Sequence, residues 1–188
     1  MSLNKGYTET EIIEGCVQQK RIFQKLLYDQ YHRKFYGICL RYSKEIAEAE
    51  DILQDGFIKI FQHIKNYSGA GSFEGWMKRI VVNTAIEYFR KRTNLYSINE
   101  LENHEELTYN DDVLSIIAAE DILKLIQDLP TGYRTVFNLY AIEGFTHKEI
   151  GAMLEINEGT SKSQLARARM ILQQKIKNLD KNFNKNIS

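Results

Sequence analysis

The chain has 188 residues, of which 43% are hydrophobic and 27% charged, and its 25 Lys and Arg side chains balance 25 Asp and Glu side chains. This composition is typical of a globular protein with one or two domains, and the zero net charge argues against a protein that coats nucleic acid unaided. The longest uncharged apolar stretches fall far short of the roughly 20 residues that span a bilayer, and the N-terminus lacks a signal-peptide core, so we expect a cytoplasmic protein without membrane insertion.

No cofactor or metal is predicted. The two cysteines, Cys16 and Cys39, lack the CxxC spacing of a zinc site and do not make a disulfide framework. A reducing compartment suits such thiols. The chain is also long enough to bury a sizeable core without a covalent or metal staple.

Apolar residues recur at three- and four-residue spacing along nearly the whole chain, and Pro130 is the only proline. This period predicts an all-α fold. The N-terminal half is expected to contain three helical stripes, over residues 22–39, 52–64 and 76–89. The loop 66–72 separates the last two stripes, and its Gly69 and Gly71 favour a turn.

The second of these helices is predicted to have a polar face opposite its core stripe. Asp51, Gln54, Asp55, Ile58 and Gln62 recur at helical spacing along that face. An apolar Ile58 among acidic side chains favours a docking surface for a helix of a partner. The alternative is a solvated face with one stray apolar residue.

The third helix combines aromatic, cationic and amide side chains, which suit single-stranded nucleic acid. Its candidate DNA-binding residues are Trp76, Lys78, Arg79, Asn83, Arg90 and Arg92. Two of them have a plainer interpretation. Trp76 can simply pack in the core, and Asn83 can satisfy a buried carbonyl instead of reading the edge of an extruded base.

Charge divides the chain into three parts. Residues 1–92 contain fifteen basic and eleven acidic side chains, residues 93–120 contain seven acidic and no basic ones, and residues 121–188 contain ten basic and seven acidic ones. An acidic segment rich in Asn, Thr and Ser between two weakly basic parts is typical of a flexible linker. We therefore expect two helical domains, 1–92 and 118–188, joined by an acidic linker at 93–117. The alternative is a long acidic loop within one domain.

The C-terminal domain is predicted to begin with a helix over 122–129. That helix ends before Pro130, because the residue before a proline is pushed out of helical geometry. A second helix is expected from about 133 to 143, and Gly144 suits its C-terminal cap.

A helix-turn-helix is expected next. Thr146 and Glu149 have the spacing of a capping box, which starts a short helix that ends near Leu154. Asn157 can cap a second helix. From Gly159 to Lys185 this second helix has seven basic side chains and one acidic side chain, so it can place positive charge near phosphates.

The basic helix has the features of a recognition helix, which reads the DNA major groove with its N-terminal end. Small side chains allow a close approach there, and the helix N-terminus favours a phosphate. The candidate residues are Thr160, Lys162, Ser163, Gln164, Ala166, Arg167 and Arg169. The alternative is a charged surface helix without a ligand.

Five segments in their order along the chain resemble a bacterial RNA polymerase sigma factor of the extracytoplasmic-function (ECF) subfamily. They are residues 49–57, 72–84, 129–134, 143–151 and 159–169. The resemblance implies a protein that binds core RNA polymerase, directs it to specific promoters and helps to melt the minus-ten element, without being an enzyme.

The resemblance also implies partners. Asp51, Gln54 and Asp55 match positions that dock on the coiled-coil clamp of the largest polymerase subunit, and Ile58 lies among them. The polymerase flap is a second expected contact, and the acidic linker matches a connector that threads the channel later occupied by RNA. Promoter DNA and an anti-sigma factor are the other expected partners.

The resemblance assigns roles at both promoter elements. The loop 66–72 with Trp76 and Asn83 matches the part that melts the upstream edge of the minus-ten element and holds a flipped base. The cations expected on the DNA backbone there are Lys78, Arg79, Arg90 and Arg92. The residues expected nearest the base edges of the minus-thirty-five element are Lys162, Ser163 and Ala166, and those expected to contact phosphates or support the helix are Thr160, Arg167 and Arg169.

Two residues depart from the pattern of the family. Ser161 stands where the family usually has valine, and Gln164 stands where it usually has arginine. The second departure weakens one expected phosphate contact, so the promoter sequence cannot be carried over.

Two other functions are compatible with parts of the sequence. An operator-binding regulator would use residues 1–92 to sense a ligand or to dimerise, and would bind specific DNA without polymerase. A helical hydrolase would rely on His63, His104 or His147, but the chain has no HExxH motif and no paired-histidine spacing.

Overall fold

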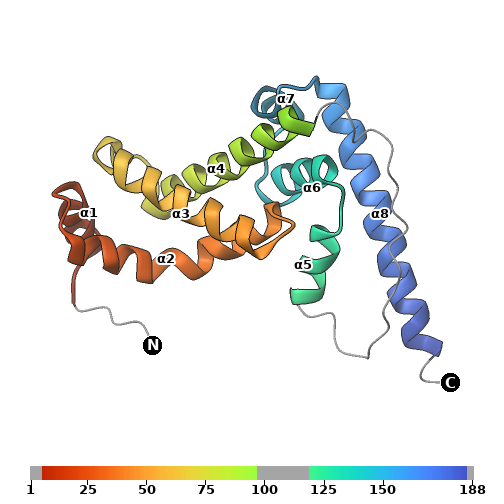
Figure 1. Ribbon diagram of the computed structural model, residues 1–188, viewed down its shortest axis with the longest axis horizontal. Coiled ribbons are helices and arrows are strands. Elements are labelled where there is room, and N and C mark those ends of the chain that lie inside the picture. The colour runs from red at the N-terminus through yellow and green to blue at the C-terminus, as the bar shows by residue number, and fades with distance from the viewer. Residues whose placement is uncertain (1–5, 97–118, 186–188) are drawn as a thin grey trace. The chain divides into compact units, whose positions relative to one another are not determined.

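The computed structural model describes residues 6–96 and 119–185, with side chains for 6–91 and 121–178. Backbone contacts divide the chain into two compact units, residues 1–87 and 88–188. Within the described residues every regular element is helical and no strand occurs (Figure 1). The predicted all-α fold is confirmed.

The first unit is a small helical body in which α2 packs along α3, and α1 packs against α2 and η1 (Figure 1). Its elements are α1 (Glu9–Val17), α2 (Arg21–Tyr42), α3 (Ile46–His63), the 3-10 turn η1 (Ile64–Asn66) and the beginning of α4 (Phe73–Tyr96). Its buried side chains include Leu27, Phe35, Ile52, Phe57, Ile60, Met77 and Val81. Most of these side chains come from the predicted stripes, so helical periodicity builds much of this core. In α4 the prediction was partly wrong, because Met77 lies outside the predicted stripe and is buried, whereas Trp76, Ile80 and Phe89 of that stripe are half-buried.

Two features of the first unit differ from the sequence predictions. The stripes do not predict α1, which begins with a capping box in which the Glu11 N–H donates to Thr8 Oγ1 at 3.2 Å. Ile12 and Cys16 bury the inner face of this short helix. The first predicted stripe begins with Ile22, and this position was wrong, because Ile22 lies in the first turn of α2 and is 53% exposed.

The expected linker lies mostly outside the described residues. Helix α4 continues to Tyr96, four residues past the expected end of the first domain at position 92. Residues 97–118 are not described, so the acidic linker at 93–117 stays a prediction.

From residue 119 onward the second unit contains the predicted helices, but the first of them begins at Ala119 and ends at Gln127 instead of spanning the expected 122–129. They are α5 (Ala119–Gln127), α6 (Thr131–Phe137), the π-helical segment η2 (Asn138–Ile142), α7 (His147–Leu154) and α8 (Glu158–Lys185). The core centres on Leu129, Ala168 and Leu172, with Tyr133 and Phe137 packed against it. The predicted helix at 133–143 is thus α6 followed by η2, and Gly144 ends it with a φ of +81°.

Arg134 ties α5 to α6 inside this unit. Its side chain is 1% exposed, and its Nη1 donates to the backbone carbonyl of Gln127 at 2.7 Å. Gln127 is the last residue of α5, where carbonyl groups lack helical partners and the helix dipole is negative. The buried guanidinium therefore serves as a C-terminal cap supplied from the next helix.

Among the described helices, none is both long enough and apolar enough to cross a bilayer.

Candidate functional site

The predicted docking face lies along α3. Asp51, Gln54, Asp55 and Ile58 are all exposed, and Ile58 is 47% exposed. The opposite side of the helix is buried in the core. At 3.6 residues per turn these four side chains share one face, so the structure brings them together as predicted.

A groove of about 640 Å³ adjoins this docking face. Gln54 and Ile58 line it from α3, together with the apolar Leu53 and Phe57. The opposite wall belongs to α2 and consists of Tyr28, His32, Arg33 and Tyr36. These α2 residues lie outside the predicted apolar stripe, and the local sequence gives them no role. Only the packing of α2 on α3 places them at the same groove as Ile58.

The loop before α4 is held by aromatic side chains at its base. The Tyr67 ring lies 5.0 Å from the Phe73 ring and 5.6 Å from the Trp76 ring. Tyr67 also donates its hydroxyl hydrogen to the Gly71 carbonyl at 2.8 Å. Gly69 and Gly71 adopt φ of +77° and +88°, which explains the need for glycine. The tip of the loop is exposed.

Trp76 takes part in this aromatic cluster and remains half-buried. Its ring stacks on the buried Phe73 with centroids 5.8 Å apart and an interplanar angle of 12°. One side of the Trp76 ring thus packs against the protein, as the packing interpretation expects. The part that stays accessible lies where the loop joins α4.

Along α4 the structure separates the predicted residues into two sets. Trp76, Arg79, Asn83 and Arg90 recur at three-, four- and seven-residue spacing, which places them on one face. Arg79 and Asn83 are exposed, so the Asn83 amide does not satisfy a buried carbonyl, and Arg90 is half-buried. Lys78 is half-buried on another side of the helix, and the side chain of Arg92 lies outside the described residues.

The helix-turn-helix forms as predicted. At the start of α7 the Glu149 N–H donates to Thr146 Oγ1 at 3.3 Å, and the Thr146 N–H donates to Glu149 Oε2 at 2.8 Å. At the start of α8 the Thr160 N–H donates to Asn157 Oδ1 at 2.7 Å. The turn between the helices passes through Glu155, whose φ is +58°.

Gly151 allows this turn to close. A Cβ atom at position 151 would lie 2.8 Å from the backbone oxygen of Ile156, closer than real Cβ atoms approach. The Ile156 N–H also donates to the Gly151 carbonyl at 3.0 Å. A side chain at this position would therefore push α7 and α8 apart.

The exposed face of α8 contains the small and basic residues expected near DNA. Lys162, Ser163 and Ala166 are exposed and form one strip, with the exposed Arg167 and Arg169 on its two edges. Thr160 and Gln164 are half-buried instead. The Gln164 amide lies beside Gly132 of α6, where a Cβ atom would be 3.5 Å from its oxygen. Thr160 and Gln164 are therefore turned towards the protein interior more than the residues of the strip are.

Two polar contacts fix the beginning of α8. Lys162 forms an ion pair with Glu158 at 2.6 Å, and this hydrogen bond with the ammonium group lowers the pKa of the Glu158 carboxyl. Ser161, which departs from the usual valine, is fully buried, and its Oγ lies 2.9 Å from Nδ1 of His147. The buried hydroxyl thus has a polar partner on the preceding helix.

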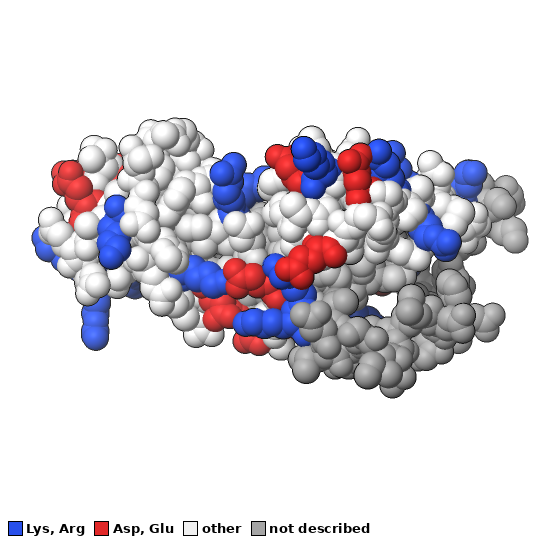
Figure 2. Space-filling model, turned by 90° about the horizontal axis from the view of Figure 1, so that it is seen from above, with Lys and Arg blue, Asp and Glu red and all other residues white. Residues whose placement is uncertain are grey.

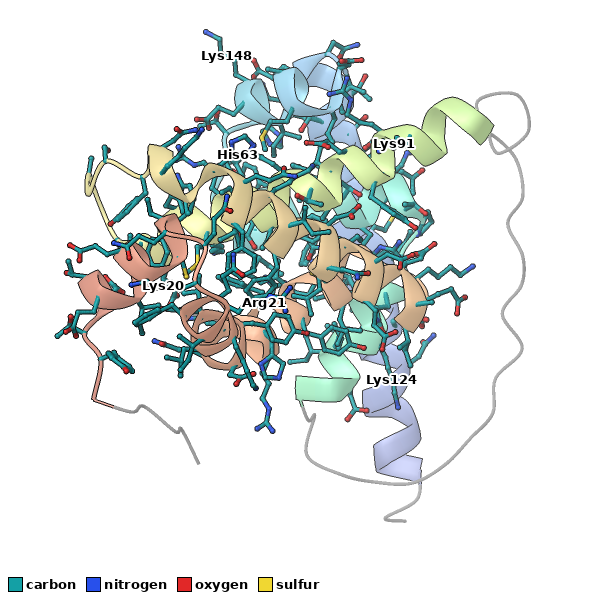
Figure 3. The ribbon with its side chains drawn as sticks, turned by 60° about the vertical axis from the view of Figure 1, so that its left-hand side comes forward. Lys20, Arg21, His63, Lys91, Lys124 and Lys148 are labelled. Carbon is teal, nitrogen blue, oxygen red and sulfur yellow. The ribbon has the colours of Figure 1, made fainter. Side chains whose placement is uncertain are left out.

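Lys148 is a further cation of the helix-turn-helix, outside the predicted site residues. It is exposed at the beginning of α7 and extends away from the helix (Figure 3). The signal in the sequence was its place inside the Thr146–Glu149 capping box, which puts it beside a helix N-terminus. On the face seen in Figure 2, basic and acidic side chains are interspersed.

Comparison with known families identifies both halves of the chain. The model of Sigma-70 region 2 matches residues 27–94, and the model of Sigma-70, region 4, matches residues 119–172. Helix α3 and its predicted docking face fall in the first match, and the helix-turn-helix falls in the second.

Relatives cover most of the chain. It is 32% identical over 165 residues to the ECF RNA polymerase sigma factor SigW of Bacillus subtilis, a match that spans 81% of this chain and 88% of the relative. It is 29% identical over 184 residues to the ECF RNA polymerase sigma-E factor of Haemophilus influenzae, spanning 92% of this chain and 97% of the relative.

A solved structure shares the fold. It is the sigma factor RpoE of Bartonella quintana in complex with the anti-sigma factor NepR, with a TM-score of 0.51 and 22% identity over 81% of this chain and 96% of that one. The family is shown by the two region matches and by the identity to SigW. The chain belongs to the ECF sigma factors of bacterial RNA polymerase, a family of transcription initiation factors.

Proposed function

We propose that this chain docks on core RNA polymerase through α3, contacts the minus-ten element with α4 and the preceding loop, and contacts the minus-thirty-five element with α8. The observation that supports this division of roles is the exposure of the three candidate faces, while the other sides of these helices are buried. In this proposal the chain acts as an initiation factor and not as an enzyme, in the cytoplasm, where the polymerase works.

The docking face combines features that suit a helical partner. The carboxylates of Asp51 and Asp55 attract basic side chains, and Ile58 offers an apolar anchor at the edge of the groove between α2 and α3. A partner helix of the polymerase clamp would place an apolar side chain in the groove and cations beside the carboxylates. This arrangement supports both affinity and register.

The minus-ten contact would combine the exposed loop with the exposed face of α4. Gly69 and Gly71 let the loop backbone come close to a DNA strand. The aromatic cluster of Tyr67, Phe73 and Trp76 holds the base of the loop in place. Asn83 has the donors and acceptors that read an extruded base, and Arg79 supplies a cation for the backbone.

The minus-thirty-five contact would use the strip on α8. Ser163 and Ala166 are small enough to let the helix enter the major groove, and Lys162 lies beside them. Because Lys162 is paired with Glu158 in the free chain, DNA competes with that carboxylate for the ammonium group. The half-buried Gln164 is expected to contribute little to phosphate binding.

An anti-sigma factor is a further expected partner. The related Bartonella quintana sigma factor is found in complex with one. A protein that covered the docking face on α3 would keep this chain from the polymerase.

Reconstituted run-off transcription from a promoter library tests the proposal. Purified core polymerase should initiate at defined sites only when this chain is added. Asp51→Lys and Asp55→Lys should together reduce co-purification with core at least about tenfold, since charge reversal at a partner face is costly. Glu14→Lys, which reverses an exposed carboxylate on α1, is the matched control. Unchanged co-purification of the double variant, or equal losses for the control, would argue against docking through α3.

A further inference from the structure

A chain of contacts joins Arg169 of α8 to residues of two neighbouring elements. The guanidinium carbon of Arg169 lies 5.7 Å from the centroid of the Tyr140 ring, which belongs to η2. The Tyr140 ring in turn stacks on the His147 ring of α7, with centroids 4.5 Å apart and an interplanar angle of 19°.

His147 is itself fixed by a buried partner. Its Nδ1 lies 2.9 Å from Oγ of Ser161, whose side chain is fully buried in the beginning of α8. A buried hydroxyl without a hydrogen bond is costly, so this contact holds the imidazole in one orientation. The ring on which Tyr140 stacks is therefore anchored to the same helix that bears Arg169.

Such an arrangement restricts an exposed arginine before it meets a ligand. Guanidinium groups stack on aromatic faces and keep their donors free at the edge of the plane. An arginine held in this way loses less freedom when it binds a phosphate. Arg167, on the other edge of the strip, contacts no aromatic ring among the described residues.

We propose that Tyr140 is a positioning residue of the minus-thirty-five interface, which holds Arg169 ready for a DNA phosphate, and that the His147–Ser161 contact braces Tyr140. This inference rests on the proposed function of α8. It gives a role to η2 and to the serine that replaces the family's usual valine, and it distinguishes Arg169 from Arg167.

A double-mutant cycle tests the proposal. Holoenzyme is reconstituted from core polymerase and full-length variants, and its affinity for a promoter recovered by run-off transcription is measured over a range of salt. Tyr140→Leu should weaken binding roughly two- to fivefold, because a stacked cation at an exposed site is lost. Arg169→Ala should weaken binding and reduce the salt slope by about one.

The coupling between the two positions is the decisive quantity. In the Arg169→Ala background Tyr140→Leu should have no further effect, whereas in the Arg167→Ala background its full effect should remain. Tyr140→Phe keeps the ring and should retain wild-type affinity. Thermal unfolding of each variant shows whether its fold is retained. We do not expect the loss of a phosphate contact to change the thermal stability of the chain.

Arg169→Lys provides a test that leaves the core untouched. It keeps the charge but not the stacking plane, so it should weaken binding more than Arg167→Lys does. Equal effects of the two lysine variants, an additive cycle, or a loss in Tyr140→Phe equal to that in Tyr140→Leu would overturn the proposal. If wild-type holoenzyme selects no promoter, the proposed function fails and this inference fails with it. If promoter selection is normal and the cycle is additive, only the positioning role fails.

Discussion

At the scale of single residues, Gly151 shows how backbone geometry limits the choice of side chain. Gly151→Ala should destabilise the C-terminal unit by about 1–3 kcal/mol, because the new Cβ would lie 2.8 Å from a backbone oxygen that cannot move freely. Urea unfolding of the variant measures this loss.

Gly132→Ala is the matched control, since its Cβ would meet only the flexible Gln164 side chain at 3.5 Å. We expect it to leave stability unchanged or to raise it slightly, as alanine favours a helix. Equal losses for both variants would contradict the account of the turn.

The two cysteines allow a second test at this scale. Burial raises the pKa of the Cys16 thiol from 9.0 to about 11, and burial raises the pKa of the Cys39 thiol to about 12. Because the thiolate is the reactive form, iodoacetamide at pH 8 should leave both residues unmodified in the folded chain and alkylate both in urea. Mass spectrometry distinguishes the two outcomes.

The same shifts have a consequence for stability. A thiol whose pKa is raised by folding stabilises the folded state fully below its unfolded pKa, and this contribution is lost as pH rises towards the folded value. The free energy of unfolding should therefore fall between about pH 9 and pH 12.

For the alkylation test, modification of the folded chain at pH 8 at the rate of a free thiol would contradict the burial of Cys16 and Cys39.

At the scale of elements, the capping box of α7 should stabilise the helix that supports α8. Thr146→Ala removes an acceptor for the Glu149 N–H and should cost about 1 kcal/mol. Faster hydrogen exchange in the first turn of α7 would show the local opening, and binding of the minus-thirty-five element should weaken.

Thr8→Ala breaks a capping box of the same type on α1, far from the helix-turn-helix in sequence. It is expected to speed exchange in α1 without weakening contact with the minus-thirty-five element. A matching loss of DNA contact in Thr8→Ala would mean that the effect of Thr146→Ala is not local.

Elements with strong local signals were predictable from the sequence. The period of α3 indicated both its core and its exposed face, and the Thr146–Glu149 box indicated where α7 begins. The sequence predictions missed α1 although it carries similar signals, since Thr8 and Glu11 have the spacing of a capping box and Ile12 and Cys16 lie one turn apart. The π-helical η2 was also missed, because the spacing of apolar residues does not distinguish it from the end of α6.

Features that depend on packing between elements could not be predicted. Nothing in the local sequence marks Arg134 as a buried cap for α5, or Tyr140 as a neighbour of Arg169. The separation of Lys78 from the exposed face of α4 follows from which side of that helix is buried. Each of these features depends on contacts between segments that are separate in the chain. The spacing of apolar residues within one segment does not reveal such contacts.

At the scale of the whole molecule, the distribution of charge and the two-unit architecture favour DNA binding that depends on the polymerase. Two weakly basic parts flank a segment with seven acidic and no basic side chains. Alone, each part should bind duplex DNA weakly, because few phosphates are neutralised and the acidic segment opposes the contact. A large partner that docks both parts at a fixed separation turns two weak contacts into one bivalent event.

A gel-shift titration of one promoter fragment, with the free chain and with reconstituted holoenzyme side by side, tests this central claim most directly. We predict that the holoenzyme binds at least about a hundredfold more tightly, in the range that bivalent attachment supplies. Core polymerase without the chain should not select the fragment. Equal affinity of the free chain and the holoenzyme would contradict the account and would favour an operator-binding regulator instead.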